Sequence, residues 1–182
     1  MDEVLPGEES TVGLVSERPV LEYSEIVVFE IGGHVCGLPL GLVREIVPMC
    51  DLAQPPGLPP LLEGLLNLRG EMTPVIRTDR LFNLPPILFH RHTQLIVVRG
   101  KIPLALLSDR VRNVVTAAPA DILPAPNDSV FNHCLAGVFP TAQGPIQLLH
   151  MERLLLAQEK QRLSDLQRMA QSRLAKLDEV KA

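Results

Sequence analysis

The chain has 182 residues, of which 46% are hydrophobic and 21% charged, enough for one ordinary domain or two small ones. Its net charge of −4 opposes binding to nucleic acid or to an anionic membrane, because surfaces that bind them normally carry a basic stripe. Aromatic residues make up only 3% and tryptophan is absent, so the chain also has few stacking platforms for single-stranded nucleic acid.

The first segment, residues 1–22, is acidic and has no periodic apolar pattern, which predicts a leader outside the folded core. It opens with Asp2 and Glu3 and not with a basic stretch before an apolar run, so we expect no secretory signal. No apolar run approaches the roughly 20 residues of a membrane span, and we expect no insertion into a membrane. The expected location is the cytoplasm.

From residue 26 onwards, short runs of β-branched and aliphatic residues alternate with glycine and proline. A tight hairpin turn is expected at Gly32-Gly33, proline-rich loops at 55–60 and 119–126, and a short helical turn from Thr78 or Asp79 to Phe82. The expected strands lie near 26–29, 34–40, 42–49, 64–68, 72–76, 94–98, 102–107, 111–116, 135–139 and 146–149. Evenly punctuated short strands of this kind are typical of small closed barrels.

The strand region contains an internal repeat. Residues 27–47 return at 95–115, and residues 64–81 return at 137–154 in the same order. A repeat of this length predicts two copies of one small structural unit. We therefore expect one domain over 23–156, built of two pseudo-repeat barrels at about 25–90 and 91–156.

The tail, residues 151–182, contains no glycine or proline and predicts a helix. One face of this helix is apolar and carries Leu156, Leu163, Leu166, Ala170, Leu174 and Leu177. Two interpretations are open: a helix packed on its own domain, or a helix that binds a partner or a second copy. The second interpretation rests on the seven-residue spacing of Leu156, Leu163, Ala170 and Leu177.

Candidate reactive groups are few. Cys36, Cys50 and Cys134 are an odd number without close pairing, which predicts reduced thiols and no disulfide framework. His90, His92 and His133 lack the paired spacing of a zinc site, so no metal or cofactor is expected. No nucleophile elbow or phosphate loop is present in the sequence, and we expect no enzymatic activity.

Residues 64–76, Gly-Leu-Leu-Asn-Leu-Arg-Gly-Glu-Met-Thr-Pro-Val-Ile, closely resemble the signature of the CheW family of chemotaxis coupling proteins. The resemblance extends over residues 25–156 in the family's order and includes Leu-Pro-Leu at 38–40 and Asp-Arg-Val at 109–111. It implies a mainly β fold of two intertwined five-stranded barrels, similar to SH3 or OB barrels, with a hydrophobic seam and a C-terminal α-helix. It also implies a non-catalytic adaptor that couples the cytoplasmic tip of a chemoreceptor to the regulatory domain of a CheA-type histidine kinase.

The resemblance also suggests site residues. Arg69 and Asn67 match the receptor-side signature, although Arg69 could instead tie the two barrels together and Asn67 could bond local backbone. Val43, Glu45 and Ile46 match the stretch that meets the kinase. Val43 and Ile46 differ by an odd number, so on a strand they face opposite ways and at least one must point outward.

The chain departs from the family where Arg77-Thr78-Asp79 replaces the usual Asp-Leu-Arg. The charges are exchanged, and we expect an ion pair of reversed polarity. The acidic leader and long tail leave open a scaffold in another chemosensory pathway, such as surface motility or second-messenger control. A nucleic-acid-binding barrel and a lone kinase-derived regulatory domain are the weaker alternatives.

Overall fold

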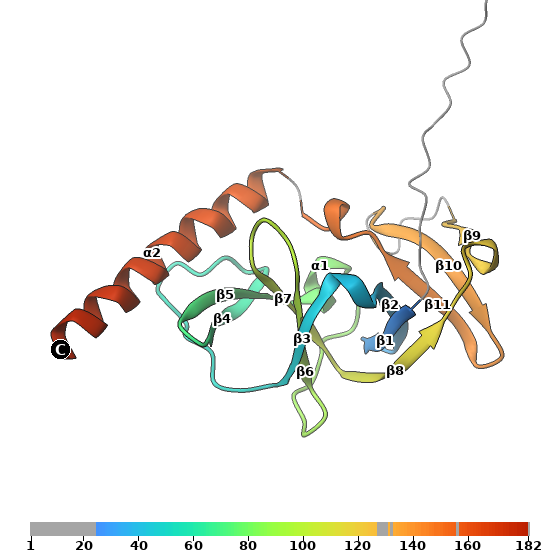
Figure 1. Ribbon diagram of the computed structural model, residues 1–182, viewed down its shortest axis with the longest axis horizontal. Helices are drawn as coiled ribbons and strands as arrows, with labels where there is room; N and C mark the ends of the chain where they lie inside the picture. The colour runs from blue at the N-terminus through green and yellow to red at the C-terminus, as the bar shows by residue number, and fades with distance from the viewer. Residues whose placement is uncertain (1–24, 127–130, 132, 156, 182) are drawn as a thin grey trace, which may run out of the picture.

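The computed structural model describes residues 25–126, 131, 133–155 and 157–181, so the expected leader at 1–22 and Leu156 lie outside the described residues. The first half of the fold contains β1 (Glu25–Ile31), β2 (His34–Pro39), β3 (Val43–Pro48), β4 (Leu62–Leu68), β5 (Glu71–Ile76) and the short helix α1 (Thr78–Leu81). The second half contains β6 (Gln94–Val98), β7 (Leu104–Ser108), β8 (Arg110–Thr116), β9 (Leu123–Pro124), β10 (Leu135–Thr141), β11 (Gly144–Leu149) and the long helix α2 (Ala157–Lys181). The predicted mainly β fold with a C-terminal helix is confirmed (Figure 1).

Two details differ from the sequence prediction. The two-residue strand β9 forms inside the proline-rich segment expected to be a loop, because it pairs with β10 at Gly137 and Val138. The tail begins with a 3-10 turn at Met151–Arg153, and the α-helix starts only at Ala157. Leu154 and Leu155, which lie between the two, are buried in the core, so this stretch packs inward before the helix begins.

The strands form two sheets. The six-stranded sheet has the order β8-β1-β2-β11-β10-β9, and the five-stranded sheet has the order β3-β6-β7-β5-β4. Neighbouring strands are antiparallel except for two pairs, β2 with β11 and β5 with β7, which are parallel. The hairpin turn between β1 and β2 falls at Gly32-Gly33 as predicted, with positive φ at both glycines.

The internal repeat explains why the two sheet orders are alike. By the sequence match, β1, β2 and β3 correspond to β6, β7 and β8, while β4 and β5 correspond to β10 and β11. Replacing each strand by its counterpart converts the order β3-β6-β7-β5-β4 into β8-β1-β2-β11-β10. Each sheet therefore combines strands of both repeats, and the two halves of the chain are interleaved.

Strand β1 is buried on both faces because it separates two apolar clusters. Val27, Phe29 and Ile31 belong to the large cluster, which also contains residues of β4, β5, β6 and β7. Ile26 and Val28 point the other way, into a smaller cluster with Ile146 and Leu148 of β11. Successive side chains of a β-strand point to opposite faces, so alternate residues of β1 pack into two different apolar clusters.

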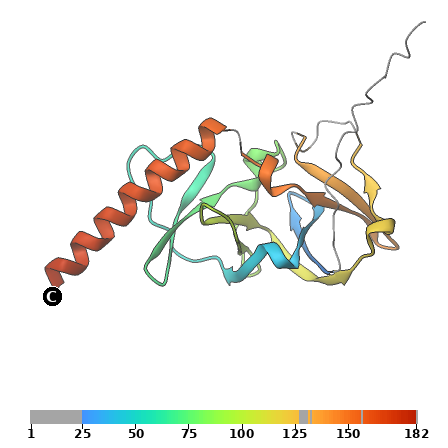
Figure 2. The same ribbon diagram turned by 45° about the horizontal axis from the view of Figure 1, so that its top comes forward.

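Helix α2 runs diagonally past β4 and β5 and continues beyond the sheets (Figures 1 and 2). Leu163 and Leu166 are buried against the large cluster, with Ala170 and Leu174 partly buried beside them, whereas Leu177 is 61% exposed. The helix packs on its own domain over this stretch, as the first interpretation predicts. Within the described residues, no helix has the length and apolar character needed to cross a membrane.

Candidate protein-binding surface

Strand β3 carries the three residues expected to meet a kinase, and these three residues differ from one another in how far they are exposed. Val43 is only 7% exposed and belongs to the large core, whereas Ile46 is 36% exposed. Their partners on β6 are Val98 and Ile96, which are two residues apart, so the opposite facing expected from their odd spacing does not follow from the strand register. Glu45 is half-buried. The pairing of β3 with β6 shifts between Val43 and Glu45, so Arg44 is the extra residue of a β-bulge. Of the three residues expected to meet a kinase, Ile46 and Glu45 are accessible to a partner, whereas Val43 packs in the core beneath the strand.

The two expected receptor-side residues lie at the turn between β4 and β5. Arg69 and Gly70 both have positive φ, 54° and 90°, which is the geometry of a two-residue hairpin turn. The side chain of Asn67 stabilises this turn, because its Oδ1 accepts a hydrogen bond of 2.9 Å from the Gly70 N–H. The Arg69 side chain is 80% exposed. Asn67 therefore shapes the turn, as the local-backbone interpretation predicts, and Arg69 is presented to solvent.

The structure brings the two sets of candidate residues together. Arg69 Nη2 lies 3.6 Å from Glu45 Oε2, and Arg44 Nη1 lies 2.5 Å from Glu71 Oε2. These contacts join β3, one end strand of the five-stranded sheet, to the hairpin of β4 and β5, in which β4 is the other end strand. We call Arg44, Glu45, Ile46, Arg69 and Glu71 the hairpin patch. Solvent-exposed ion pairs contribute little to stability, so these side chains are available to a partner.

Helix α2 holds the same turn from the other side. Gln171 Nε2 donates a hydrogen bond of 2.8 Å to the Gly70 carbonyl, and Gln171 Oε1 accepts one of 3.0 Å from the Met72 N–H. The amide thus pairs with the backbone on both sides of Glu71, as a neighbouring strand would. No feature of the sequence predicts this role, because a glutamine on a helix with many polar residues is ordinary.

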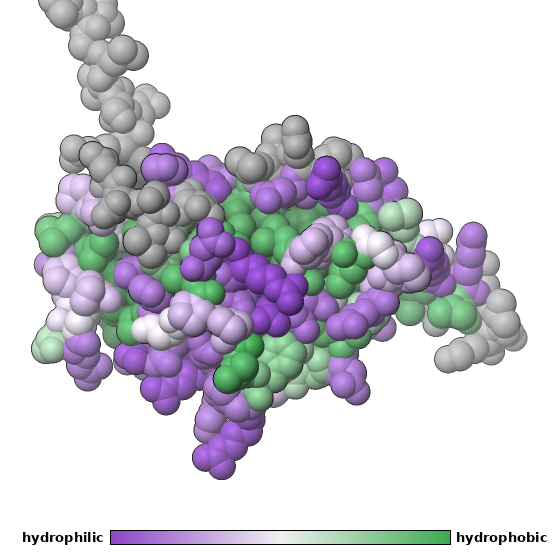
Figure 3. Space-filling model, turned by 180° about the vertical axis from the view of Figure 1, so that it is seen from behind, coloured by the Kyte–Doolittle hydropathy of each residue, from purple (hydrophilic) through white to green (hydrophobic). Residues whose placement is uncertain are grey.

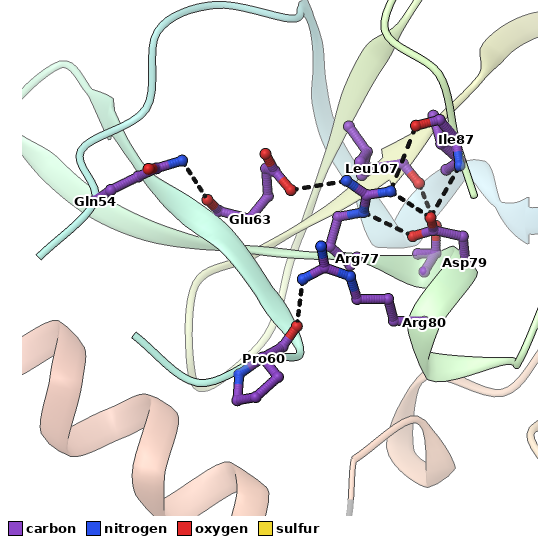
Figure 4. Close-up of polar contacts among 9 residues, drawn as sticks. Gln54, Pro60, Glu63, Arg77, Asp79, Arg80, Ile87 and Leu107 are labelled. Carbon is purple, nitrogen blue, oxygen red and sulfur yellow. Dashed lines mark hydrogen bonds and ion pairs between the residues drawn. The ribbon is translucent and has the colours of Figure 1, made fainter. Parts of the chain in front are cut away.

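Arg77 forms the buried ion pair expected from its departure from the family. Its Nε and Nη2 donate to both carboxylate oxygens of Asp79 at 2.9 and 2.5 Å, and its Nη1 donates to Glu63 Oε2 at 3.0 Å (Figure 4). Asp79 Oδ2 also accepts a hydrogen bond from the Ile87 N–H. Burial alone would raise the pKa of Asp79, but the Arg77 guanidinium and the Ile87 amide outweigh burial and lower it. This cluster is structural.

Histidine, cysteine and acidic side chains do not gather into a metal site in the part of the chain that the structure describes. Across residues 25–126, 131, 133–155 and 157–181, no group of three or more His, Cys, Asp and Glu side chains could hold an ion. Cys36 is buried in the core, and burial raises the pKa of its thiol well above the ordinary value. That environment keeps the thiol protonated and unreactive.

Two interleaved small sheets and a tail helix define a double-barrel module with an exposed charged patch at one hairpin. Residues 25–159 match the CheW-like domain, and the chain belongs to this family. The fold implied by the resemblance is thereby confirmed, and the match extends three residues beyond the end expected from the sequence.

Relatives and a solved structure agree with this assignment. The chain is 24% identical over 152 residues to the chemotaxis protein CheW of Treponema pallidum, covering 80% of this chain and 89% of that protein. It is 28% identical over 103 residues to the chemotaxis protein CheW of Bacillus subtilis, covering 56% and 66%. The crystal structure of the scaffolding protein TtCheW from Thermoanaerobacter tengcongensis superposes with a TM-score of 0.69 at 25% identity, covering 74% of this chain and 89% of that one.

Proposed function

We propose that this chain is a non-catalytic adaptor of bacterial chemosensory signalling, which couples the cytoplasmic tip of a chemoreceptor to the regulatory domain of a CheA-type histidine kinase. The observation that carries the proposal is the CheW-like match over residues 25–159, most of the described fold. The proposal places the chain in the cytoplasm, at receptor arrays beside the membrane.

The hairpin patch is the proposed contact surface. Arg69 offers a guanidinium that is 80% exposed and can hold carbonyls or carboxylates of a receptor helix in fixed geometry. Ile46, with Glu45 beside it, offers a mixed apolar and acidic contact to the kinase domain. Asn67 supports the receptor side by shaping the turn, and Val43 supports the kinase side from the core.

The test is co-elution of the full chain with a receptor signalling fragment and, separately, with a kinase regulatory domain. Arg69→Ala should weaken receptor binding, and Ile46→Asp should weaken kinase binding, because each removes an exposed contact without opening the core. Arg99→Ala, at an exposed arginine just beyond β6, is the control for loss of one positive charge. If both variants stay folded and bind both partners as tightly as Arg99→Ala does, the hairpin patch is not the contact surface.

Self-association through α2 is a further part of the proposal. Leu163 and Ala170 already pack on the domain, so the seven-residue series cannot form a continuous seam while the helix stays in place. Among the described side chains of α2, the large apolar ones left exposed for a second copy are Met169 and Leu177. If the parent chain self-associates, Leu177→Asp should lower its apparent mass in sedimentation velocity at high protein concentration. If the parent and Leu177→Asp both sediment with the mass of a single chain, the protein is a monomer.

A further inference from the structure

A basic hollow of about 520 Å³ opens where β3 and β8, each an end strand of its sheet, come together. Its lining includes four basic side chains: Arg91 and His92 from the loop before β6, and Arg110 and Arg112 from β8. The described residues that line it include no carboxylate. The loop before β6 projects below the body in Figure 1, and the same projection is hydrophilic in Figure 3.

Backbone contacts fix the shape of this hollow. Gln94 of β6 accepts a hydrogen bond of 2.8 Å at Oε1 from the Val111 N–H of β8, which ties the two sheets together at the floor. The pairing of β1 with β8 shifts so that Val28 faces Asn113 and Phe29 faces Val111. Arg112 is therefore the extra residue of a β-bulge, a feature that redirects a side chain.

The positive charges exceed their protein partners. Glu30 Oε1 accepts hydrogen bonds from Arg110 Nε and Nη2 at 3.1 and 2.9 Å, and also from Arg112. Arg91 Nε donates to His92 Nε2 at 2.9 Å, a partner that supplies no negative charge. Arg110 and Arg112 thus share the one Glu30 carboxylate, and Arg91 pairs with no carboxylate among the described residues. Three guanidiniums beside the cavity therefore have one acidic partner between them, which leaves two positive charges unpaired in a chain whose net charge is −4.

The repeat provides an internal comparison. Arg44 of β3 is the counterpart of Arg112 in the repeat, and it is likewise the extra residue of a bulge. The two side chains are almost equally exposed, at 37% and 34%. Arg44, however, pairs with Glu71 and approaches Glu45, and the counterpart of Arg110 is Leu42. The excess of positive charge is confined to the second copy.

We propose that this hollow is a binding site for a small phosphate-bearing polyanion, either a free diphosphate or the diphosphate group of a nucleotide. Its volume falls within the range of about 300–1,000 Å³ that small-ligand pockets occupy. Arginine forks bind phosphate oxygens through two parallel hydrogen bonds, and such charge-assisted bonds are strong. A ligand with several negative charges balances the two unpaired positive charges, whereas a single carboxylate balances only one.

Calorimetric titration of the full chain with inorganic pyrophosphate tests the proposal. We expect saturable binding of one ion per chain, weakened about tenfold by Arg112→Ala, since each lost charge-assisted bond is worth about 1.5 kcal/mol. Arg91→Ala is the second variant, because Arg91 does not touch Glu30 and its loss leaves the β1–β8 contacts intact. A parallel titration with ADP separates the two sources: tighter binding than pyrophosphate indicates a nucleotide, and weaker binding indicates the free ion.

Arg44→Ala is the matched control, with the same residue type at the same place in the repeat and nearly the same exposure. It should leave pyrophosphate affinity within about twofold of the parent, since screening by salt limits the reach of a distant exposed charge. Absence of saturable binding up to about 1 mM, which corresponds to roughly −4 kcal/mol, would overturn the proposal. Equal weakening by Arg44→Ala and Arg112→Ala would also overturn it, because the effect would then be one of net charge alone.

Discussion

The guanidinium of Arg77 is held by two carboxylates and lies 5.5 Å from the centre of the Phe89 ring. Asp79 is almost fully buried and receives bonds from Arg77 and from the Ile87 amide, so its carboxylate binds α1 to the chain that follows it. A buried charge that loses its partner is far more costly than an intact pair is favourable. The cluster is therefore sensitive to single changes.

We expect Asp79→Ala to lower the free energy of unfolding by about 3–5 kcal/mol, because it leaves Arg77 partly uncompensated and the Ile87 N–H without its acceptor. Urea unfolding followed by circular dichroism measures this loss. Asp51→Ala, which removes an exposed carboxylate, is the control and should cost less than about 0.5 kcal/mol. A cost for Asp79→Ala as small as that of the control would mean that the pair adds nothing to the fold.

Glu30 predicts a pH dependence. Burial would raise the pKa of its carboxyl, but hydrogen bonds from Arg110 and Arg112 outweigh burial and lower it. The folded pKa lies below the unfolded value of about 4.3, so the stabilisation is present above that pH and is lost as the pH falls through the folded pKa. The difference in unfolding free energy between the parent and Glu30→Gln should therefore shrink between pH 6 and pH 3.

Urea titrations at several pH values measure this difference. Glu25→Gln, at an exposed position on the same strand, serves as the control for removal of one acidic charge. A difference between parent and Glu30→Gln that stayed constant over the whole range would show that the two arginines do not stabilise the ionised carboxylate.

At the scale of the elements, the Gln171 side chain links α2 to the turn of the β4–β5 hairpin by two hydrogen bonds. Gln171→Ala removes both backbone hydrogen bonds at Gly70 and Met72, and we expect it to lower stability by about 1–2 kcal/mol. Amide exchange of Met72 should become faster, because its N–H loses its acceptor. Ser172→Ala, one residue along the helix and exposed, should change neither quantity. Unchanged Met72 exchange in Gln171→Ala would show that the helix does not hold the turn.

The elements themselves were largely predictable, because strand length, turn glycines and the repeat are local signals. Two glycines that match in the repeat show what the sequence predicts and what only the structure explains. Gly64 and Gly137 match in the repeat, but the reason appears only in space: a Cβ on Gly64 would lie 2.6 Å from the Leu52 Cβ, and one on Gly137 would lie 2.8 Å from the Leu123 carbonyl oxygen. Each glycine lies where another segment crosses its strand. Contacts between distant segments, such as Gln171 with Gly70 or Arg69 with Glu45, carry no signal in either local sequence.

At the scale of the whole molecule, interleaving makes the two sheets depend on each other. Parallel pairing joins β5 of the first repeat to β7 of the second, and β11 of the second repeat to β2 of the first. The sequence predicted two equal units, and the resemblance implied that they are intertwined, but periodicity cannot show which strands are exchanged. Neither sheet can form from one repeat alone, so unfolding should be a single cooperative transition.

Two core substitutions, one for each apolar cluster, test this cooperativity. Leu106 of β7 is fully buried in the large cluster, and Ile146 of β11 is buried in the small one. We expect Leu106→Ala and Ile146→Ala each to cost about 2–5 kcal/mol, as cavity-forming changes do. In each variant, methyl NMR signals from both sheets should disappear at the same lowered urea concentration, while Val114→Ala, at an exposed position, leaves the midpoint unchanged. If Ile146→Ala melted the six-stranded sheet first and left the signals of the five-stranded sheet intact, each sheet would be an independent unit. The exchange of strands between the repeats would then link the two sheets along the chain without making the stability of one sheet depend on the other.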